Sequence, residues 1–286
     1  MRTSFRPALV ALGAAVAVTA VAACSSDSSK PSASTTTKPA TQPLSILVTN
    51  DDGYAAPGIS TVTQALAAMP DVKVTVVAPA TNQSGTGGQT TTGTLTTLPG
   101  TQKTAAGHAA TAVVGFPSDS VNYALDTMHL KPDLVVSGIN QGQNLGPLTA
   151  VSGTVGAAKR AAAAGIPAIA VSQGIAATPQ YEVAAGLTVK WVAANRDALA
   201  GHTAAVGVVN LNVPTCTTGA LRGVKQVPLA TTTQGAVGSS NCTSTVTSVA
   251  NDIDAFANGF APVTQLGPDG QAVTSSTTFP TTKGST

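Results

Sequence analysis

Two adjacent carboxylates follow the first short apolar run of the chain. Residues 46–48 are Ile-Leu-Val, and residues 50–53 are Asn-Asp-Asp-Gly. A short branched run bounded by turn residues indicates a strand buried on both faces of a parallel sheet. Because ligands of such sheets bind beyond the carboxyl ends of the strands, Asp51 and Asp52 are expected among the first polar groups that a ligand meets. The alternative is a simple turn, since Asn, Asp and Gly are all common in turns.

Neutral oxygen donors follow two further predicted strands. Ser84 lies in a glycine-containing loop after the strand at 72–77, and Asn140 follows the next buried strand. Together with Asp51 and Asp52 they offer hard oxygen ligands, which suit magnesium, manganese or calcium better than zinc or copper. An ion of this kind can polarise a phosphoryl oxygen and activate a water molecule. These residues therefore favour a divalent-cation site.

A predicted helix start offers a place for an anion. Ser152, Gly153 and Thr154 precede an alanine-rich helix at 155–164. Unpaired backbone N–H groups at such a start carry the positive end of the helix dipole and can hold a phosphate. Simple capping of the helix by Ser152 or Thr154 is an equally good interpretation of these residues alone.

Other chemistries find no support in the sequence. The three histidines belong to no motif, and the Gly-x-Ser-x-Gly elbow of serine hydrolases is absent. Only 9% of the residues are charged and the formal net charge is +2, which gives no argument for a nucleic-acid partner. Cys216 and Cys242 lack neighbouring His or Cys partners, which disfavours zinc. A disulfide between them is compatible with an exported protein.

The N-terminus has the features of an export signal. Two arginines precede an apolar run from Ala8 to Ala23, which is too short for a membrane span. The run leads into Cys24, and Val-Ala-Ala-Cys resembles the lipobox of bacterial lipoproteins, whose cysteine is lipidated. We expect a signal peptide over 1–23, a disordered Ser/Thr/Pro tether over 24–43, and a lipid anchor to the outer face of the cytoplasmic membrane in the cell envelope. The alternative is a plain signal peptide followed by secretion.

Strand and helix patterns alternate through residues 44–270, which predicts an α/β domain with a mostly parallel sheet. Residues 271–286 are expected to be a disordered tail. Helices are predicted at 59–69, 121–130, 155–164, 183–199 and 252–259, the second of them capped by Ser118 or Asp119. Strands are predicted at 46–48, 72–77, 134–136, 169–172, 206–213 and 260–266, with hairpin segments around Leu95 and at 112–114.

These motifs, in this order, resemble the SurE family, the bacterial survival-protein nucleotidases. The resemblance rests on residues 46–58, 76–85, 115–119, 132–146, 152–155 and 165–172, and it continues through 210–214. It implies a Rossmann-like three-layer sandwich with a small C-terminal extension. It also implies that the extension joins copies of the chain, as a homodimer or a larger assembly.

The resemblance further implies metal-dependent hydrolysis of nucleoside 5′- and 3′-monophosphates to nucleoside and phosphate. The cation is expected to be Mg²⁺ or Mn²⁺, held by Asp51, Asp52, Ser84 and Asn140. Asp51 and Asp52 are the expected catalytic residues, with Asp51 the candidate for assisting proton transfer. The groups expected on the phosphate side are Asn50, Asn144, Ser152, Gly153 and Thr154.

The chain departs from the family's pattern near this site. Residues 147–151 are Pro-Leu-Thr-Ala-Val, where the family usually has acidic residues and a tyrosine. After Leu229, a Thr/Ser-rich segment that contains Cys242 replaces the family's hairpin. The alternative function is therefore that of an envelope lipoprotein that binds a phosphorylated or other small ligand without turnover.

Overall fold

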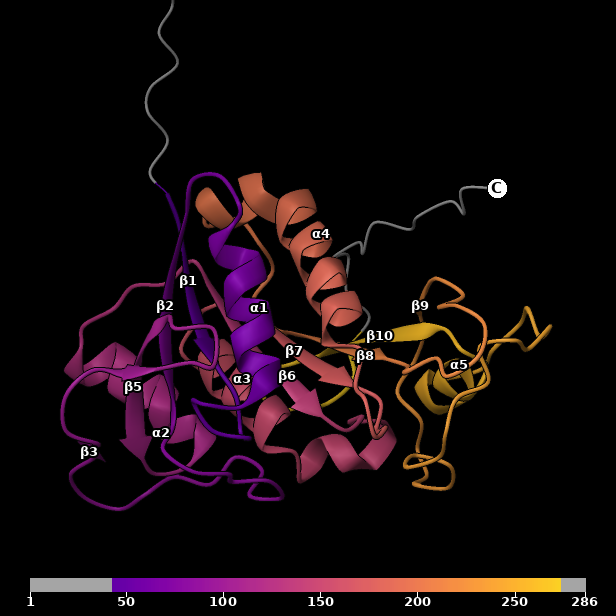
Figure 1. Ribbon diagram of the computed structural model, residues 1–286, viewed down its shortest axis with the longest axis horizontal. Helices are drawn as coiled ribbons and strands as arrows, with labels where there is room; N and C mark the ends of the chain where they lie inside the picture. The colour runs from indigo at the N-terminus through magenta and orange to yellow at the C-terminus, as the bar shows by residue number, and fades with distance from the viewer. Residues whose placement is uncertain (1–42, 274–286) are drawn as a thin grey trace, which may run out of the picture. The chain divides into compact units, whose positions relative to one another are not determined.

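The computed structural model of the protein describes residues 43–273 (Figure 1). Several predicted features lie outside this range: the signal peptide, the lipidation site at Cys24, the tether as far as residue 42 and residues 274–286 of the tail. None of the helices within 43–273 combines the length and the apolar character needed to cross a membrane.

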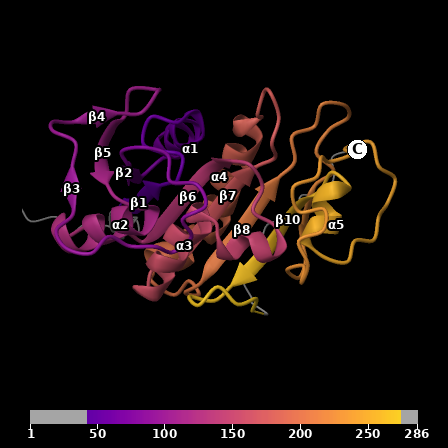
Figure 2. The ribbon, with the colours of Figure 1, turned by 90° about the horizontal axis from the view of Figure 1, so that it is seen from below.

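One ten-stranded sheet forms the centre of the structure (Figure 2). Its middle consists of six parallel strands in the order β5 (Ala109–Val114), β2 (Val72–Pro79), β1 (Leu44–Thr49), β6 (Leu134–Gln141), β7 (Ala168–Gln173) and β8 (Val208–Val213). Four further strands extend the two edges of the sheet. At one edge, β3 (Thr96–Thr97) and β4 (Gln102–Lys103) run antiparallel to β5. At the other, β10 (Ala261–Leu266) runs antiparallel to β8, and β9 (Val224–Gln226) pairs with β10. The prediction of a mostly parallel sheet is confirmed.

Helices cover both faces of this sheet (Figure 2). Helices α1 (Pro57–Ala67) and α4 (Tyr181–Ala200) pack together over one face, where Ile59 and Trp191 belong to the larger apolar core. Helices α2 (Pro117–Asn122) and α3 (Gly153–Ala163), with the π-helical turn η1 (Tyr123–Thr127), cover the other face. Because each face of a parallel sheet must be shielded from water, the strands are apolar on both sides, as predicted.

The strand register brings the polar segments of the sequence to one edge of the sheet. Val48 of β1 lies opposite Val76 of β2 on one side and Val136 of β6 on the other. The carboxyl ends of these three parallel strands therefore lie level with one another. The segments that follow them contain the predicted metal ligands.

Residues 109–114 pair antiparallel with β3 and β4, which confirms the expected hairpin segments, and they also pair parallel with β2. Two details differ from the sequence-based expectations. The N-cap of α2 is Phe116, because Pro117 is the first residue of the helix and has no N–H that needs a partner. Asp119 is the third residue of the helix, and its carboxylate accepts the Phe116 N–H. Residues 271–273 are ordered, because they pair with the end of β10 through the Gly267 and Val273 N–H groups.

A buried aspartate holds the C-terminal extension to the rest of the domain. Helix α5 (Asp252–Ala257) begins at Asp252, whose side chain is fully buried. Its Oδ2 accepts the N–H of Gly146 at 2.8 Å, and its Oδ1 accepts the N–H groups of Ala230 and Ile253. Gly146 opens the short 3-10 helix η2 (Gly146–Ala150), so the extension contacts the loop that precedes α3. Burial raises the pKa of Asp252, although the three N–H donors oppose that effect.

Replacing Asp252 with Asn is expected to lower the free energy of unfolding by about 1–3 kcal/mol, because the new amide group cannot accept all three N–H bonds. The cost should also depend on pH. A carboxyl group whose pKa is raised by folding stabilises the protein fully below its unfolded pKa, and this contribution is lost as the pH rises through the folded pKa. Urea unfolding should therefore show a larger cost at about pH 4 than at about pH 8. A cost that grows toward pH 8 would mean that the N–H donors outweigh burial.

Candidate metal and phosphate site

A tight turn after β1 separates the side chains of Asp51 and Asp52. Asn50 is completely buried, and its amide group donates to the Gly53 carbonyl at 2.9 Å and accepts the Gly53 N–H at 3.2 Å. Gly53 has a φ of 100°, a conformation that glycine adopts without strain. Asn50 therefore shapes the turn that presents the two carboxylates, with both of its side-chain polar atoms bonded to Gly53.

The carboxylate of Asp51 lies at the start of α3. Thr154 Oγ1 donates to Asp51 Oδ1, and the Thr154 N–H is also directed at this carboxylate. A Cβ atom built on Gly153 would lie only 2.7 Å from Asp51 Cβ, so the helix approaches the aspartate as closely as a glycine permits. An anion does lie at the predicted helix start, and it is Asp51 itself. Ser152 caps the helix, since its Oγ accepts the Val155 N–H at 3.1 Å.

Asp52 joins the loop after β2 to the end of β6. Its Oδ1 accepts the side-chain amide of Asn82 at 3.2 Å, and its Oδ2 accepts the N–H of Gln141 at 3.1 Å. Asn82 in turn accepts the N–H of Ser84, while the N–H of Gln83 donates to the Asp51 carbonyl. These bonds hold the Ser84 loop beside the aspartate pair.

The two neutral donors keep oxygen atoms available. Asn140 uses its Nδ2 to donate to the Gly142 carbonyl at 2.7 Å, which leaves its Oδ1 as the free acceptor. The Oγ of Ser84 has no hydrogen-bond partner among residues 43–273. The structure thus brings together the segments that carry all four predicted metal ligands, at the edge where β1, β2 and β6 end.

The electrostatics of the two carboxylates fit a cation. Burial raises the pKa of Asp51. Burial and the neighbouring charge of Asp51 raise the pKa of Asp52 to about 6. Two like charges held this close and partly desolvated are stabilised when a cation joins them, and the donors are the hard oxygens that Mg²⁺ and Mn²⁺ prefer. Within residues 43–273, no three His, Cys, Asp or Glu side chains are placed so that they could hold a metal ion. A cation beside Asp51 and Asp52 would therefore also need neutral oxygens, such as those of Ser84 and Asn140.

Tyr181 is a member of the site that sequence reasoning missed. The ring of this residue, the first of α4, packs against the backbone where Gly58 approaches Ile139. The pKa of Tyr181 is raised to about 12, by burial and by the negative charge of Asp52. The tyrosine is therefore within electrostatic range of Asp52, and its position at a helix start far along the chain gave no sign of this.

Asn144, which is predicted on the phosphate side, is buried and hydrogen-bonded to residues of β7 and β8. Its Nδ2 donates to Ser172 Oγ of β7 at 2.9 Å, and its N–H donates to Asn212 Oδ1 of β8 at 2.6 Å. Its carbonyl accepts the side-chain amides of Asn210 and Asn212. Asn144 thus fastens the loop after β6 to the ends of the two next strands.

The close approach of α3 to Asp51 makes Gly153 sensitive to substitution. Replacing Gly153 with Ala should lower the free energy of unfolding by about 1–2 kcal/mol, because the new methyl group forces the helix start away from Asp51. If the site acts on a ligand, this displacement should weaken its activity about tenfold. Gly186 in α4 is the matched control, since a Cβ there would meet no atom within 4 Å. Thermal unfolding and activity that are equally unaffected in both variants would contradict the close packing.

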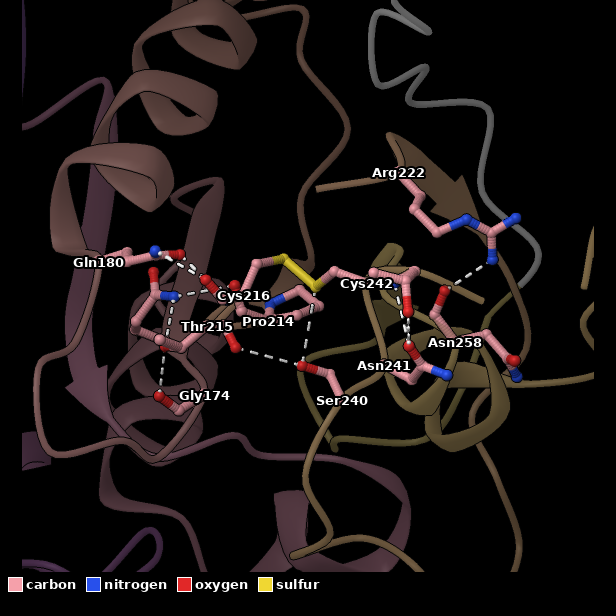
Figure 3. The surroundings of a disulfide bond; sticks show 12 residues. Gly174, Gln180, Pro214, Thr215, Cys216, Arg222, Ser240, Asn241, Cys242 and Asn258 are labelled. Carbon is pink, nitrogen blue, oxygen red and sulfur yellow. Dashed lines mark hydrogen bonds between the residues drawn. A yellow bond between two sulfur atoms is a disulfide. The ribbon is translucent and has the colours of Figure 1, made fainter. Parts of the chain in front are cut away.

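A disulfide joins Cys216 to Cys242, with the two Cα atoms 5.6 Å apart (Figure 3). Cys216 follows β8, and Cys242 lies in the Thr/Ser-rich segment before α5. The N–H of Cys216 donates to Gln180 Oε1, and the Gln180 amide donates back to the Cys216 carbonyl. The C-terminal extension is therefore tied to the loop that leads into α4.

Comparisons with known proteins agree with this geometry. Residues 46–236 match the model of the family described as Survival protein SurE. The 5′-nucleotidase SurE of Methylococcus capsulatus is 36% identical over 187 residues, which cover 65% of this chain and 70% of that protein. The crystal structure of the SurE protein from Aquifex aeolicus aligns with a TM-score of 0.60 at 28% identity, covering 79% of this chain and 94% of the other.

Proposed function

Because this chain belongs to the SurE family, we propose that it is a divalent-metal-dependent phosphomonoesterase that hydrolyses nucleoside 5′- and 3′-monophosphates to nucleoside and phosphate. The observation that carries the proposal is the contact between Asp51 and the start of α3. It places a carboxylate suited to a cation beside the Gly153 N–H, which lies at the positive end of the α3 dipole and is suited to a phosphate. The name of the Methylococcus relative, a 5′-nucleotidase, supports the substrate class.

Four residues would hold the ion, which we propose to be Mg²⁺ or Mn²⁺: Asp51, Asp52, Ser84 and Asn140. When bound, a divalent ion supplies Lewis-acid polarisation of a phosphoryl oxygen and lowers the pKa of water. The protein fixes the positions of these ligands through the bonds that Asp52 accepts from Asn82 and Gln141. Ligands that are already in position need no rearrangement during the reaction. This preorganisation supplies most of the rate enhancement at such sites.

The remaining groups orient the substrate and move a proton. The N–H of Gly153, at the positive end of the α3 dipole, donates to a phosphoryl oxygen beside Asp51. Oδ2 of Asp51, the oxygen that does not accept from Thr154 Oγ1, takes a proton from the water that attacks phosphorus. The P–O bond to the nucleoside breaks, and Asp51 returns the proton to the leaving nucleoside oxygen.

We also propose the setting in which this activity operates. Residues 1–23 would direct export, Cys24 would carry the lipid anchor, and residues 24–43 would hold the domain away from the outer face of the cytoplasmic membrane. The oxidising compartment outside the cytoplasm suits the disulfide between Cys216 and Cys242. Assembly into a homodimer is proposed from family membership alone.

Phosphate release tests the activity directly. The protein should release phosphate from 5′-AMP and 3′-AMP in the presence of Mn²⁺ or Mg²⁺, and EDTA should abolish the release. A glycerol phosphate serves as a substrate without a nucleoside. Tight binding of AMP without any release of phosphate would favour the alternative of a ligand-binding lipoprotein. No binding of AMP at all would exclude the nucleotidase and would leave only a lipoprotein that binds a different small ligand.

A further inference from the structure

The end of β6 and the loop that follows it carry the proposed metal ligand Asn140. The Nδ2 atom of Asn140 donates to the Gly142 carbonyl at 2.7 Å, and the Gly142 N–H donates to the Gln173 carbonyl at 2.8 Å. Because the amide nitrogen of Asn140 is bonded in this way, the direction of its Oδ1 depends on the position of residue 142. Any contact that holds this loop in place therefore also holds the ligand oxygen.

Gln143, the next residue of the loop, joins it to two distant segments. The residue is buried, with 6% of its surface exposed. Its Nε2 donates to the Gly238 carbonyl at 3.0 Å, and its Oε1 accepts the Ile175 N–H at 3.2 Å. Gly238 and Ile175 are 95 and 32 positions away in the sequence. One buried side chain thus connects the loop after β6 with the loop after β7 and with the C-terminal extension.

The other contacts between this loop and the extension lie farther from Asn140 along the chain. The Gly146 N–H donates to Asp252, and Leu145 belongs to a small apolar cluster with residues of the extension. Among the hydrogen bonds that join the loop to the extension within residues 43–273, the bond from Gln143 therefore begins nearest to the ligand.

The segment of the extension that Gln143 reaches is itself anchored. Cys242 follows Gly238 by four positions and forms the disulfide with Cys216. Between them, Ser240 Oγ donates to the Thr215 carbonyl at 3.4 Å (Figure 3). Gly238 also lies beyond the end of the part of the chain that matches the family model. The anchor is therefore a feature of the C-terminal segment of this chain.

We propose that Gln143 is a positioning residue for the metal site: by connecting the loop after β6 to the extension, it holds Asn140 Oδ1 where the cation binds. The inference rests on the proposed function and adds to it a residue outside the four proposed ligands. Removing a group that orients a metal ligand typically lowers metal affinity or activity by about 10- to 100-fold. If the two bonds of Gln143 only stabilised the fold, the metal affinity of the folded protein would not change.

The variant Gln143→Met removes both hydrogen bonds and keeps a side chain of similar length. Its affinity for Mn²⁺, measured by calorimetry, should be about tenfold lower than that of the wild type. Phosphate release from 5′-AMP should fall by a similar factor at a low Mn²⁺ concentration, and saturating Mn²⁺ should restore kcat to within about twofold. Unchanged Mn²⁺ affinity, or a loss of kcat that saturating Mn²⁺ does not restore, would overturn the proposal.

Asn258→Leu is the matched control, because it also replaces an amide side chain with an apolar one. Asn258 Nδ2 donates to the Asp254 carbonyl at 2.9 Å, and its Oδ1 accepts from Ser244 Oγ at 2.7 Å. These bonds lie within the extension and do not reach the loop after β6. Mn²⁺ affinity in this variant should stay within about twofold of the wild type. A loss as large as that of Gln143→Met would show that any loosening of the extension is sufficient, and would overturn the specific role of Gln143.

The disulfide offers a second test, which leaves Gln143 unchanged. Because Cys242 helps to hold Gly238, replacing Cys216 and Cys242 with Ser should lower Mn²⁺ affinity about threefold in the chain that keeps Gln143. The same replacements should cause no further loss in Gln143→Met, where the connection to the extension is already broken. Equal losses in the two backgrounds would mean that the disulfide acts by another route, and would overturn the proposed connection.

Hydrogen exchange separates this proposal from the proposed activity. Without metal or substrate, Gln143→Met should quicken the exchange of the backbone N–H groups of residues 142–144 and of Ile175, and should leave β1 unaffected. If exchange quickens in this way but the wild type neither binds Mn²⁺ nor releases phosphate, the proposed function fails and the hold of Gln143 on the loop stands. If the wild type does both and Gln143→Met matches it in Mn²⁺ affinity and in exchange, only the positioning proposal fails.

Discussion

Replacing Asp51 with Asn is expected to reduce metal-dependent phosphate release by about a thousandfold or more, because the substitution removes one of only two charged ligands and the proposed proton acceptor. The fold should survive. The buried site prefers a neutral group, as the raised pKa of Asp51 shows, and an amide oxygen can still accept from Thr154 Oγ1. The expected result is a variant without activity whose thermal unfolding temperature is equal to that of the wild type or above it.

Steady-state phosphate release and calorimetric titration with Mn²⁺ measure the two consequences separately. Asp126→Asn is the matched control, since Asp126 is exposed and lies on η1. Mn²⁺ affinity should fall with Asp51→Asn even if no substrate is turned over, so the metal assignment can be tested without the activity. A variant that keeps a tenth of the wild-type rate, or the full affinity for Mn²⁺, would contradict the assignment of Asp51.

Removing the disulfide is expected to have the largest effect on stability. The cysteines are 26 positions apart, and a crosslink that closes a loop of this length stabilises a protein by about 3 kcal/mol, chiefly by restricting the unfolded chain. Replacing Cys216 and Cys242 with Ser should lower the free energy of unfolding by that amount. Part of the cost should also be seen as increased mobility of residues 238–242, whose position the disulfide helps to fix.

Urea unfolding with and without a reducing agent checks this prediction. The reductant should destabilise the wild type to the level of the double variant and should leave the double variant unchanged. Hydrogen exchange should quicken in residues 214–243 and stay the same in β1 and β6, which the disulfide does not touch. Equal stability of the wild type under oxidising and reducing conditions would show that the bond contributes nothing.

Much of the fold could be predicted from the sequence because its elements have strong local patterns. The runs that became β1, β6 and β7 are short, branched and apolar, and Ser152 precedes its helix with the residue type that caps helices best. Weaker patterns predicted less. The hairpin segment at 112–114 was expected, but its extension to 109–114, its parallel pairing with β2 and the strand β9 were not. The strand β5 is built from Ala, Thr and Val, and an edge strand of three residues such as β9 is too short for any periodicity. Pairing with a neighbouring strand, rather than the composition of either segment, makes such residues strands.

Some features of the candidate site could likewise be predicted from the sequence, and others could not. The sequence by itself determined which polar residues stand at strand ends, and the parallel arrangement of those strands then requires them to share one edge of the sheet. Only the tertiary structure decided which groups touch. Asp51 meets Thr154 at a separation of 103 residues, Asp52 meets Gln141 at 89, and Asp252 meets Gly146 at 106.

Other features of the site were also decided by the tertiary structure alone. They are the electrostatic effect of Asp52 on Tyr181 and the hydrogen bonds that engage Asn50 and Asn144 in the framework. A side chain reveals its residue type in the sequence, but its partner, its burial and its pKa depend on backbone that is distant in the chain. Local periodicity carries no information about such contacts, and the packed fold creates them.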